Sequence, residues 1–400
     1  MNIFRNIRNW FTSLLNVFRN EFGLVWGNVG VMLFFFALPV AYPVVYTLIY
    51  NPEVVRNIPV AVIDHSRTPE SREWTRMVNA TDGIEVYAIS TTLDEARRLH
   101  RNHEVFGIME IPADFDKCIA RGEQANVTFY SDMGLLLRLR TFMINLTNAQ
   151  MAECANIRNA TIASLGAVAG SMSAPQVDQE SVMIGDPTQG FASFIIPGIV
   201  VLILQQSMIL GVTMLAGGAS ERRRKYGYDP KAVAAPASAS VFGKALCYVM
   251  LYIPLTIYIL DIVPAIFNLP HYGNMIHNLI FILPLLFGSA FLGMALGAFV
   301  KERESSFMVV VFTSVIFLFL SGLTWPRYAM SGFWKLCGDA IPCVWALEGF
   351  VRLNSNGASL AGESHCYAMM WLLAAIYFLA AMFLTRYLDK SLRVRSRLLS

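Results

Sequence analysis

Residues 216–246 read AGGASERRRKYGYDPKAVAAPASASVFGKAL, and this stretch decides how the rest of the chain is organised. It lies between two long apolar runs and holds four consecutive cations, Arg222, Arg223, Arg224 and Lys225. Such a segment cannot lie in hydrocarbon, and a basic cluster beside a membrane-spanning run stays on the cytoplasmic side. The stretch therefore predicts a cytoplasmic segment, 216–244, that joins two transmembrane helices.

The composition places the whole chain in a membrane. Of its 400 residues, 55% are hydrophobic and only 15% are charged, whereas a soluble domain carries about a quarter charged residues. Residues 51–190 hold 12 Lys and Arg against 18 Asp and Glu, and the rest of the chain holds 19 against 10. The basic residues flank apolar runs, which favours the membrane surface as their partner and argues against nucleic acid.

Six apolar runs predict six transmembrane helices. The first, 29–50, is long enough to cross a bilayer at 1.5 Å per residue. The other five lie within residues 191–388, at 191–215, 241–267, 275–300, 307–325 and 367–388. Residues 1–28 place apolar and polar side chains on opposite faces, which predicts an interfacial helix. Residues 389–400 are a basic tail.

Residues 51–190 are the one large polar region, and their pattern alternates. Short apolar runs predict strands at 60–63, 84–89, 105–111 and 127–130. Helical patterns follow the first three of them, and a long helix is expected at 135–169. Strands that alternate with helices indicate an α/β domain.

The Lys and Arg residues set the orientation. The N-terminus, 216–244, 301–304 and the C-terminal end from Arg386 onward together hold 16 of them, against three in the opposite short segments. The positive-inside rule therefore places both termini in the cytoplasm and residues 51–190 outside. Residues 326–364 are too polar to cross and are expected to form short helices at the outer surface. The fold predicted is an α-helical polytopic membrane protein with an inserted extracytoplasmic α/β domain and an N-terminal interfacial helix.

Motifs for chemistry are not visible in the chain. It contains no GxxxxGK[ST], HExxH, GxSxG or CxxC pattern, so we expect no catalytic centre, cofactor or metal site of its own. Among the cysteines a disulfide within Cys337, Cys343 and Cys366 stays open, with unpaired buried thiols favoured. Asp261 is the one acid within a predicted span, and a position near the outer headgroups accounts for it better than an ion site.

Several short motifs, in their order and spacing, resemble those of ABC exporter permeases of the ABC-2 class with a large extracytoplasmic domain after the first span. The stretches that carry the resemblance are 58–66 (IPVAVIDHS), 106–115 (FGIMEIPADF), 122–130, Asp186-Pro187, Pro197-Gly198, Pro236 with 242–244 (FGK), 321–326 (SGLTWP), Pro342 and 348–352 (EGFVR). One departure concerns the E-R-E-x-G-T run of that class. Glu221 and Gly227 fit it, but Arg224 and Lys225 stand where an acid is common and Tyr228 where Thr is common.

The resemblance implies a bacterial inner-membrane complex. Two permeases, identical or paralogous, would pair above two ATP-binding subunits that hold ATP and Mg²⁺, and a periplasmic adaptor stays open. The inner segment between spans two and three would receive the push of the ATPase, with Gly217 and Gly218 as a hinge. The residues expected there are Glu221, Arg222, Arg223, Arg224, Tyr226 and Gly227. Pro326, Pro342, Glu348 and Arg352 resemble an outer re-entrant hairpin, in which we expect Glu348 to lie where the outer helices meet the bundle.

Two other functions stay open at this point. A membrane-anchored extracytoplasmic sensor would use the α/β domain for signal binding, although six spans exceed what an anchor needs. A secondary transporter would need more charged residues within its spans than Asp261 alone. For an exporter, the lack of a charged stripe along the spans favours an amphipathic, lipid-like or drug-like substrate.

Overall fold

The computed structural model describes residues 2–50, 54–131, 134–165, 190–269 and 271–399. The chain divides into two compact units, one made of Met1–Asn51 with Met183–Ser400 and the other of Pro52–Val182. Among the described residues, five helices are long and apolar enough to cross a membrane: Val29–Tyr50, Phe191–Tyr226, Ala237–Ile266, Met275–Gly297 and Ser364–Tyr387.

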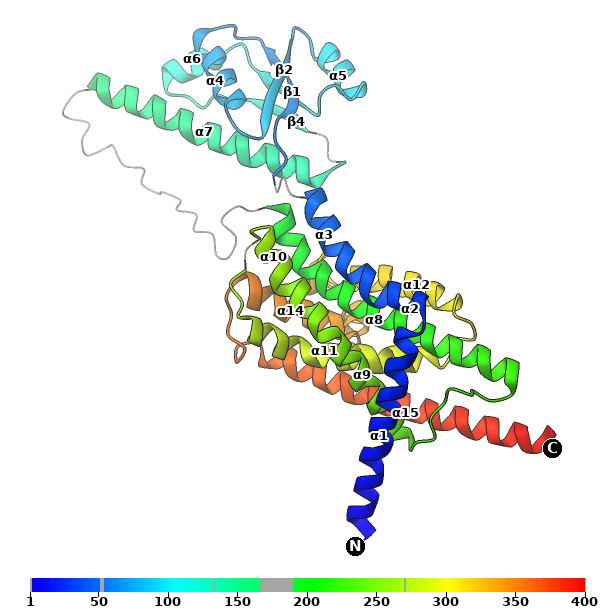
Figure 1. The fold of residues 1–400 in the computed structure, drawn as a ribbon. Helices are drawn as coiled ribbons and strands as arrows, with labels where there is room; N and C mark the ends of the chain where they lie inside the picture. The colour runs from blue at the N-terminus through cyan, green and yellow to red at the C-terminus, as the bar shows by residue number, and fades with distance from the viewer. Residues whose placement is uncertain (1, 51–53, 132–133, 166–189, 270, 400) are drawn as a thin grey trace. The chain divides into compact units, whose positions relative to one another are not determined.

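Helix α8 (Phe191–Tyr226) is the axis of the first unit (Figure 1). It packs against α3 (Leu38–Tyr50), α11 (Met275–Gly297), α12 (Ser305–Leu320) and α14 (Pro342–Ser355). Its 36 residues span about 54 Å at 1.5 Å per residue, whereas the hydrocarbon core is about 30 Å thick. The helix therefore extends well beyond the hydrocarbon. It ends at Gly227, whose φ of 77° suits a glycine C-cap.

This continuous helix corrects the predicted loop at 216–244. Gly217 and Gly218 lie inside α8, and a Cβ on Gly217 would come within 2.8 Å of the Glu302 carbonyl oxygen. The two glycines therefore allow close packing and are not a hinge. Only residues 227–236 lie outside helices, because α9 (Ala237–Ile257) begins directly after Pro236.

The fifth predicted span is shorter than expected. Helix α12 covers Ser305–Leu320, 16 residues, or about 24 Å, so it falls short of the hydrocarbon thickness. It stops because Gly322 adopts φ 89°, a left-handed conformation that a helix cannot continue through.

The segment 326–364 forms the short helices expected of it: η4 (Arg327–Ala329), α13 (Gly332–Asp339) and α14. Helix α13 exposes Phe333 and Trp334. Helix α14 is buried among α8, α11 and α15 (Ser364–Leu399) because its apolar residues cover most of its circumference. The position of this segment at the outer membrane surface stays a prediction. All six cysteines are free thiols.

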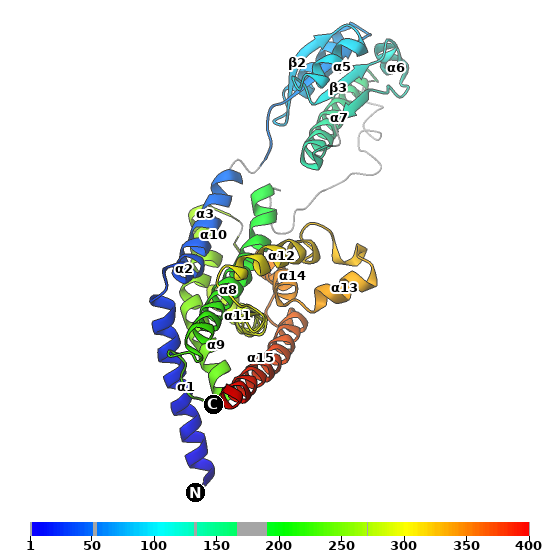
Figure 2. The same ribbon diagram turned by 90° about the vertical axis from the view of Figure 1, so that its right-hand side faces the viewer.

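Helix α1 (Asn2–Trp26) lies along α9, as Figures 1 and 2 show. Gly243 lets the two helices approach, since a Cβ there would be 2.9 Å from the Leu14 carbonyl oxygen. Leu14, Val17 and Val25 are buried, whereas Ile7 and Phe11 on the predicted apolar face are exposed. After Trp26 the chain continues through α2 (Val29–Met32), the π-helical turn η1 (Leu33–Ala37) and α3. A second π-helical turn, η3 (Tyr258–Ile262), joins α9 to α10 (Val263–Ile266).

The second unit is an α/β layer structure, in which all four expected strands are present. The sheet has the order β2-β1-β3-β4, from β1 (Ile58–Asp64), β2 (Ile84–Ser90), β3 (Gly107–Ile111) and β4 (Thr128–Ser131). Strand β1 pairs in parallel with β2 and β3, and β4 is antiparallel to β3. The central strand β1 is buried on both faces, which explains its continuous apolar run.

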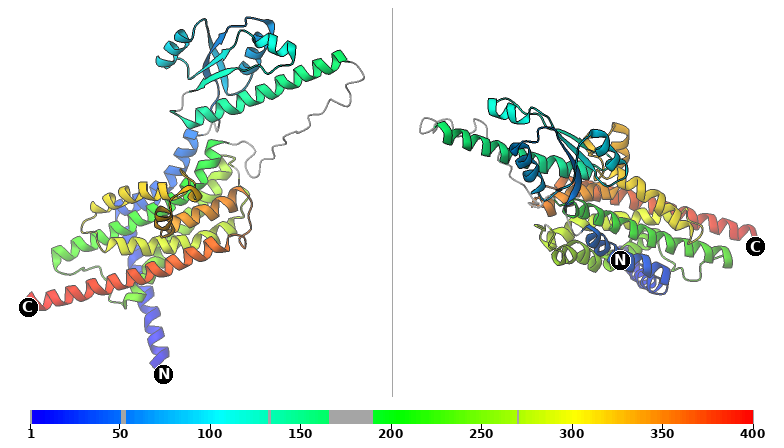
Figure 3. Two further views of the ribbon diagram at one scale, coloured as in Figure 1. Left: turned by 180° about the vertical axis from the view of Figure 1, so that it is seen from behind. Right: turned by 90° about the horizontal axis from the view of Figure 1, so that it is seen from above.

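Helices cover the two faces of this sheet (Figures 2 and 3). On one face α4 (Pro69–Asn79), α6 (Phe115–Arg121) and α7 (Leu136–Leu165) contribute Trp74, Val78, Phe115 and Phe142 to the larger core. On the other face α5 (Leu93–Arg101) contributes Ala96. Helix α4 starts at a Thr68–Ser71 capping box and α5 at the Thr92 hydroxyl, which satisfies free N–H groups at both helix ends.

Candidate functional site

The charged end of α8 is bound to the turn that follows α11. The Glu221 carboxylate accepts a hydrogen bond from the Arg303 backbone N–H at 2.7 Å, and its other oxygen lies 3.4 Å from Arg303 Nε. Arg224 donates to Glu302 at 2.8 Å. These four residues, which we name the α8 clamp, hold the turn 301–304 against the helix where Gly217 and Gly218 leave room for it.

A second pair holds the connection 227–236 against α8. Arg222 donates two hydrogen bonds to Asp229, at 2.7 and 3.0 Å, and the Lys231 N–H donates to the same carboxylate. Burial alone would raise the pKa of Asp229, but the hydrogen bonds and charge of Arg222 outweigh it, so the pKa lies below its usual value. The pair therefore stabilises the fold at neutral pH, and this contribution is lost only as the pH falls through that lowered pKa.

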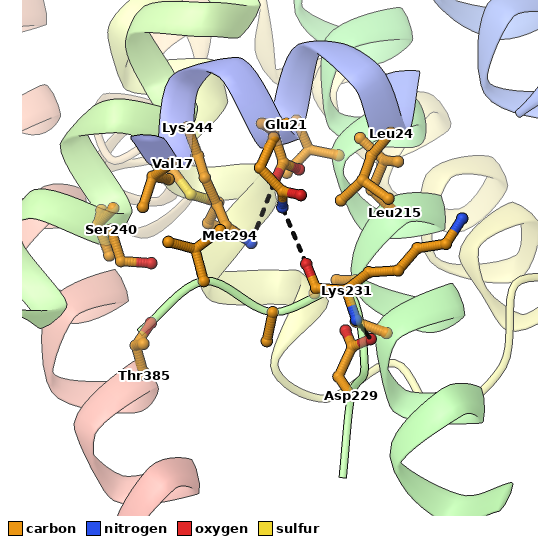
Figure 4. A pocket seen from close by; sticks show the side chains of 18 of the residues that line it. Val17, Glu21, Leu24, Leu215, Asp229, Lys231, Ser240, Lys244, Met294 and Thr385 are labelled. Carbon is orange, nitrogen blue, oxygen red and sulfur yellow. Dashed lines mark hydrogen bonds and ion pairs between the residues drawn. The ribbon is translucent and has the colours of Figure 1, made fainter. Parts of the chain in front are cut away.

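A cavity of about 180 Å³ lies beside this connection, lined by α1, α8, α9, α11 and residues 229–235 (Figure 4). Glu21 of α1 faces it and is 2% exposed. Lys244 Nζ lies 3.5 Å from the Glu21 carboxylate, and the Tyr248 hydroxyl donates to it. Asn20 donates to the Lys231 carbonyl at 2.9 Å. Because the buried Glu21 carboxylate has both of its partners, Lys244 and Tyr248, on α9, it ties α1 to α9.

The last aromatic and basic side chains of α8 and Tyr228 are exposed. Tyr226 is 53% exposed, Tyr228 is exposed as well, and Lys225 Nζ lies 5.2 Å from the centre of the Tyr226 ring. Arg223 is half-buried and lines the cavity. The residues predicted for ATPase coupling therefore have different positions. Glu221 and Arg222 contact neighbouring parts of the chain, whereas Tyr226 is exposed and could contact another molecule. Gly227 ends the helix.

Sequence reasoning missed the partners of these residues. No local pattern in the sequence predicts that the partners are Asp229, Lys244, Glu302 and Arg303. Glu21 left a signal, because it is the one acid in residues 1–28 and lies four residues from both Val17 and Val25 on the buried face of α1. A lone acid at an apolar position of an amphipathic helix predicts a buried partner.

A second cluster of charged residues surrounds Glu348 of α14, which lies near the N-terminal end of α8. Its carboxylate accepts from Arg327 at 2.5 Å and from Arg352 at 2.6 Å. Arg327 also pairs with Asp339, and its guanidinium lies 4.6 Å from the centre of the Trp345 ring. Arg352 reaches Glu363 at 3.5 Å. Each charge here has a partner of opposite sign, so the group is a continuous ionic network.

This network borders a cavity of about 620 Å³. Its walls combine apolar side chains such as Phe194, Leu323 and Val351 with the charged Arg327, Glu348 and Arg352. The two predicted prolines frame the segment, since Pro326 precedes η4 and Pro342 begins α14. The four residues predicted for the outer segment therefore belong to one region, with Glu348 and Arg352 at its centre.

The described residues hold no group of three or more His, Cys, Asp or Glu side chains that could bind a metal ion. Asp261 accepts a hydrogen bond from Asn278 at 3.1 Å and lies 3.4 Å from His271. This acid thus has neutral and titratable partners between α11 and the segment after α10.

Comparison with known proteins adds one match. Residues 30–383 match the family model described as ABC-2 family transporter protein. No curated protein matches the chain.

The close contact at Gly217 gives a testable prediction. Gly217→Ala adds a Cβ within 2.8 Å of the Glu302 carbonyl oxygen and must displace the turn 301–304. At a cost of about 1–3 kcal/mol, the α8 clamp should open about 5- to 150-fold more often, and limited trypsin digestion of the purified protein should cut faster at 222–225. Gly23→Ala is the matched control, because a Cβ on that helical glycine meets nothing within 4 Å. Equal cleavage rates in both variants would show that the clamp does not depend on this contact.

Proposed function

Because this chain belongs to the ABC-2 family of transporter proteins, we propose that it is the permease of an ATP-driven exporter. The family makes it a multi-pass membrane subunit that works with a separate ATP-binding subunit. The proposed cargo is an amphipathic, lipid-like or drug-like molecule, moved out of the cytoplasm or the inner leaflet. The proposed setting is a bacterial inner membrane with both termini in the cytoplasm.

The observation that carries this proposal is the charged end of α8. The helix is about 24 Å longer than the hydrocarbon is thick, and its last residues, 221–226, combine charge with an exposed tyrosine. On the proposed orientation this end faces the cytoplasm, where an ATP-binding subunit can dock on Tyr226 and Lys225. Tyrosine is among the residues that most often anchor protein interfaces.

Force applied there would move α8, α11 and the turn 301–304 together. Besides the α8 clamp, small residues lock the helices: a Cβ on Gly297 would be 2.7 Å from Ala216 Cβ, and one on Gly293 would be 3.1 Å from Val212 Cβ. Such close-packed helices shift as rigid bodies. A hinge at Gly217 would absorb the movement, and α8 has none there.

The same helix reaches the second cavity. Gln205 of α8 accepts a hydrogen bond from the Cys343 N–H of α14 at 2.9 Å, and Gly198 packs against Leu323 and Leu347. A shift of α8 would therefore displace α14, which carries Glu348 and Arg352. This gives the proposed coupling a physical route between the two ends of the helix.

The size and lining of that cavity support the proposed substrate class. A volume of about 620 Å³ lies within the range of about 300–1,000 Å³ that small-molecule sites occupy. Apolar walls beside a charged network suit a molecule with an apolar body and a polar group. The proposed assembly contains a second permease, either a copy or a paralogue, and a periplasmic adaptor would extend it to efflux across two membranes.

Orientation can be tested by labelling in intact spheroplasts. Asn102 is exposed at the end of α5, so Asn102→Cys should react with a membrane-impermeant maleimide from outside. Cys118 and Cys154 lie in the same unit and must first be changed to serine. Tyr226→Cys should react only after permeabilisation. The reverse pattern would overturn the proposed topology.

The coupling role predicts two different defects. Tyr226→Ala removes an exposed contact and should weaken binding of the ATP-binding subunit about 5- to 30-fold. Glu221→Ala breaks a charge-assisted bond worth about 1.5–3 kcal/mol inside the permease, so it should leave binding intact but lower transport per ATP hydrolysed.

The measurements are co-purification, ATP turnover and transport in reconstituted vesicles, with Tyr272→Ala as the exposed tyrosine control. The permease alone should hydrolyse no ATP. Normal binding and normal transport in both variants would move the coupling role elsewhere, to α1 or to the turn 301–304.

A further inference from the structure

The unit Pro52–Val182 contains a cavity that the proposed export role does not use. It has a volume of about 550 Å³ and lies between the sheet, α4, α6 and α7, with residues 122–127 along one side. All of its lining residues belong to this unit.

The inner walls of the cavity are apolar. They include Trp74, Met109 and Phe115 from the larger core, with Phe129 and Leu146 beside them. The charged and amide lining residues are exposed or half-buried instead: Glu123, Gln124, Asn126, Gln150, Glu153 and Arg158. An apolar interior with a polar rim is the usual build of a small-molecule site, and the volume lies in the same range.

One buried donor in the wall has no acceptor. Trp74 is 7% exposed, and its Nε1–H makes no hydrogen bond to any described residue. Buried indole N–H groups normally find a partner, and leaving one without a partner costs about 1–3 kcal/mol. An acceptor oxygen on a molecule in the cavity would remove that cost.

We propose that this cavity binds a small amphipathic molecule whose apolar part fills the space between α6, α7 and the sheet. A carbonyl, ether or hydroxyl oxygen of the ligand accepts the hydrogen bond from Trp74 Nε1, and its polar end meets the rim at Gln150 and Arg158. Binding needs no ATP and no partner subunit, so this site can be tested independently of the export function.

The test uses Trp74 as a reporter, because it is the single tryptophan of residues 52–182. The full chain carrying 5-fluorotryptophan is placed in lipid nanodiscs and titrated with monodecanoylglycerol, a single-chain ester with acceptor oxygens. Trp74→Phe assigns the Trp74 signal in the ¹⁹F spectrum. We expect that signal to shift saturably, while the signals of the six other tryptophans follow only the partition of the probe into lipid.

Two variants and a control test whether the probe binds in this cavity. Ala125→Phe fills the cavity from a half-buried wall position, and Gln150→Phe narrows its rim from an exposed position that tolerates substitution. Each should weaken binding at least tenfold. Tyr87→Phe, exposed on β2 and outside the cavity, should bind as the unaltered chain does.

Three results would overturn the proposal. The first is a Trp74 shift that never saturates. The second is a shift shared equally by all seven tryptophans, and the third is unchanged affinity in Gln150→Phe.

Discussion

The cost of placing charge in hydrocarbon determines the architecture of the membrane unit. Helix α8 carries five charged residues at 221–225, and none of them can enter the bilayer core without a partner. The helix meets this constraint by continuing past the membrane as one rigid element, and it holds its end in place with Glu221, Arg222 and Arg224. Each of these finds its partner in a neighbouring segment: Arg303, Asp229 and Glu302. The turn 301–304 and the connection 227–236 are thereby fixed relative to α8.

In the proposed mechanism, this arrangement would let the membrane unit receive force from the ATP-binding subunit. Most of the charges at the end of α8 stiffen the permease, and the aromatic Tyr226 remains for an external contact. On the other side of the same connection, the buried Glu21 carboxylate ties α1 to α9 through Lys244 and Tyr248. A subunit that docked on this surface would therefore act on α1, α8, α9 and α11 at once, and α8 would carry the displacement to the network around Glu348.

The local sequence pattern predicted most helices and strands. It failed where contacts between residues far apart in the sequence determine the structure. Strand β1, the start of α5 near Thr92 and the long apolar runs follow from neighbouring residues, so their positions could be predicted from the sequence. The Gly217-Gly218 pair illustrates the failure. Two adjacent glycines favour a hinge when only the local backbone is considered, but contact with the turn 301–304 keeps them helical, and that contact depends on residues more than 80 positions away. Glu21 and Lys244 likewise meet only through the packing of α1 on α9. The shortened α12 depends on the backbone of Gly322, which hydropathy does not report.

The proposed mechanism depends on direct contact between Tyr226 and the ATP-binding subunit. Site-specific photo-cross-linking tests this contact most directly. Benzoylphenylalanine replaces Tyr226 in the assembled complex, and in a parallel sample it replaces Tyr328, which is 89% exposed and borders the other cavity. After illumination, the account predicts a covalent product with the ATP-binding subunit from position 226 and none from position 328. A product from Tyr328, or no product from Tyr226 in a complex that hydrolyses ATP, would contradict it.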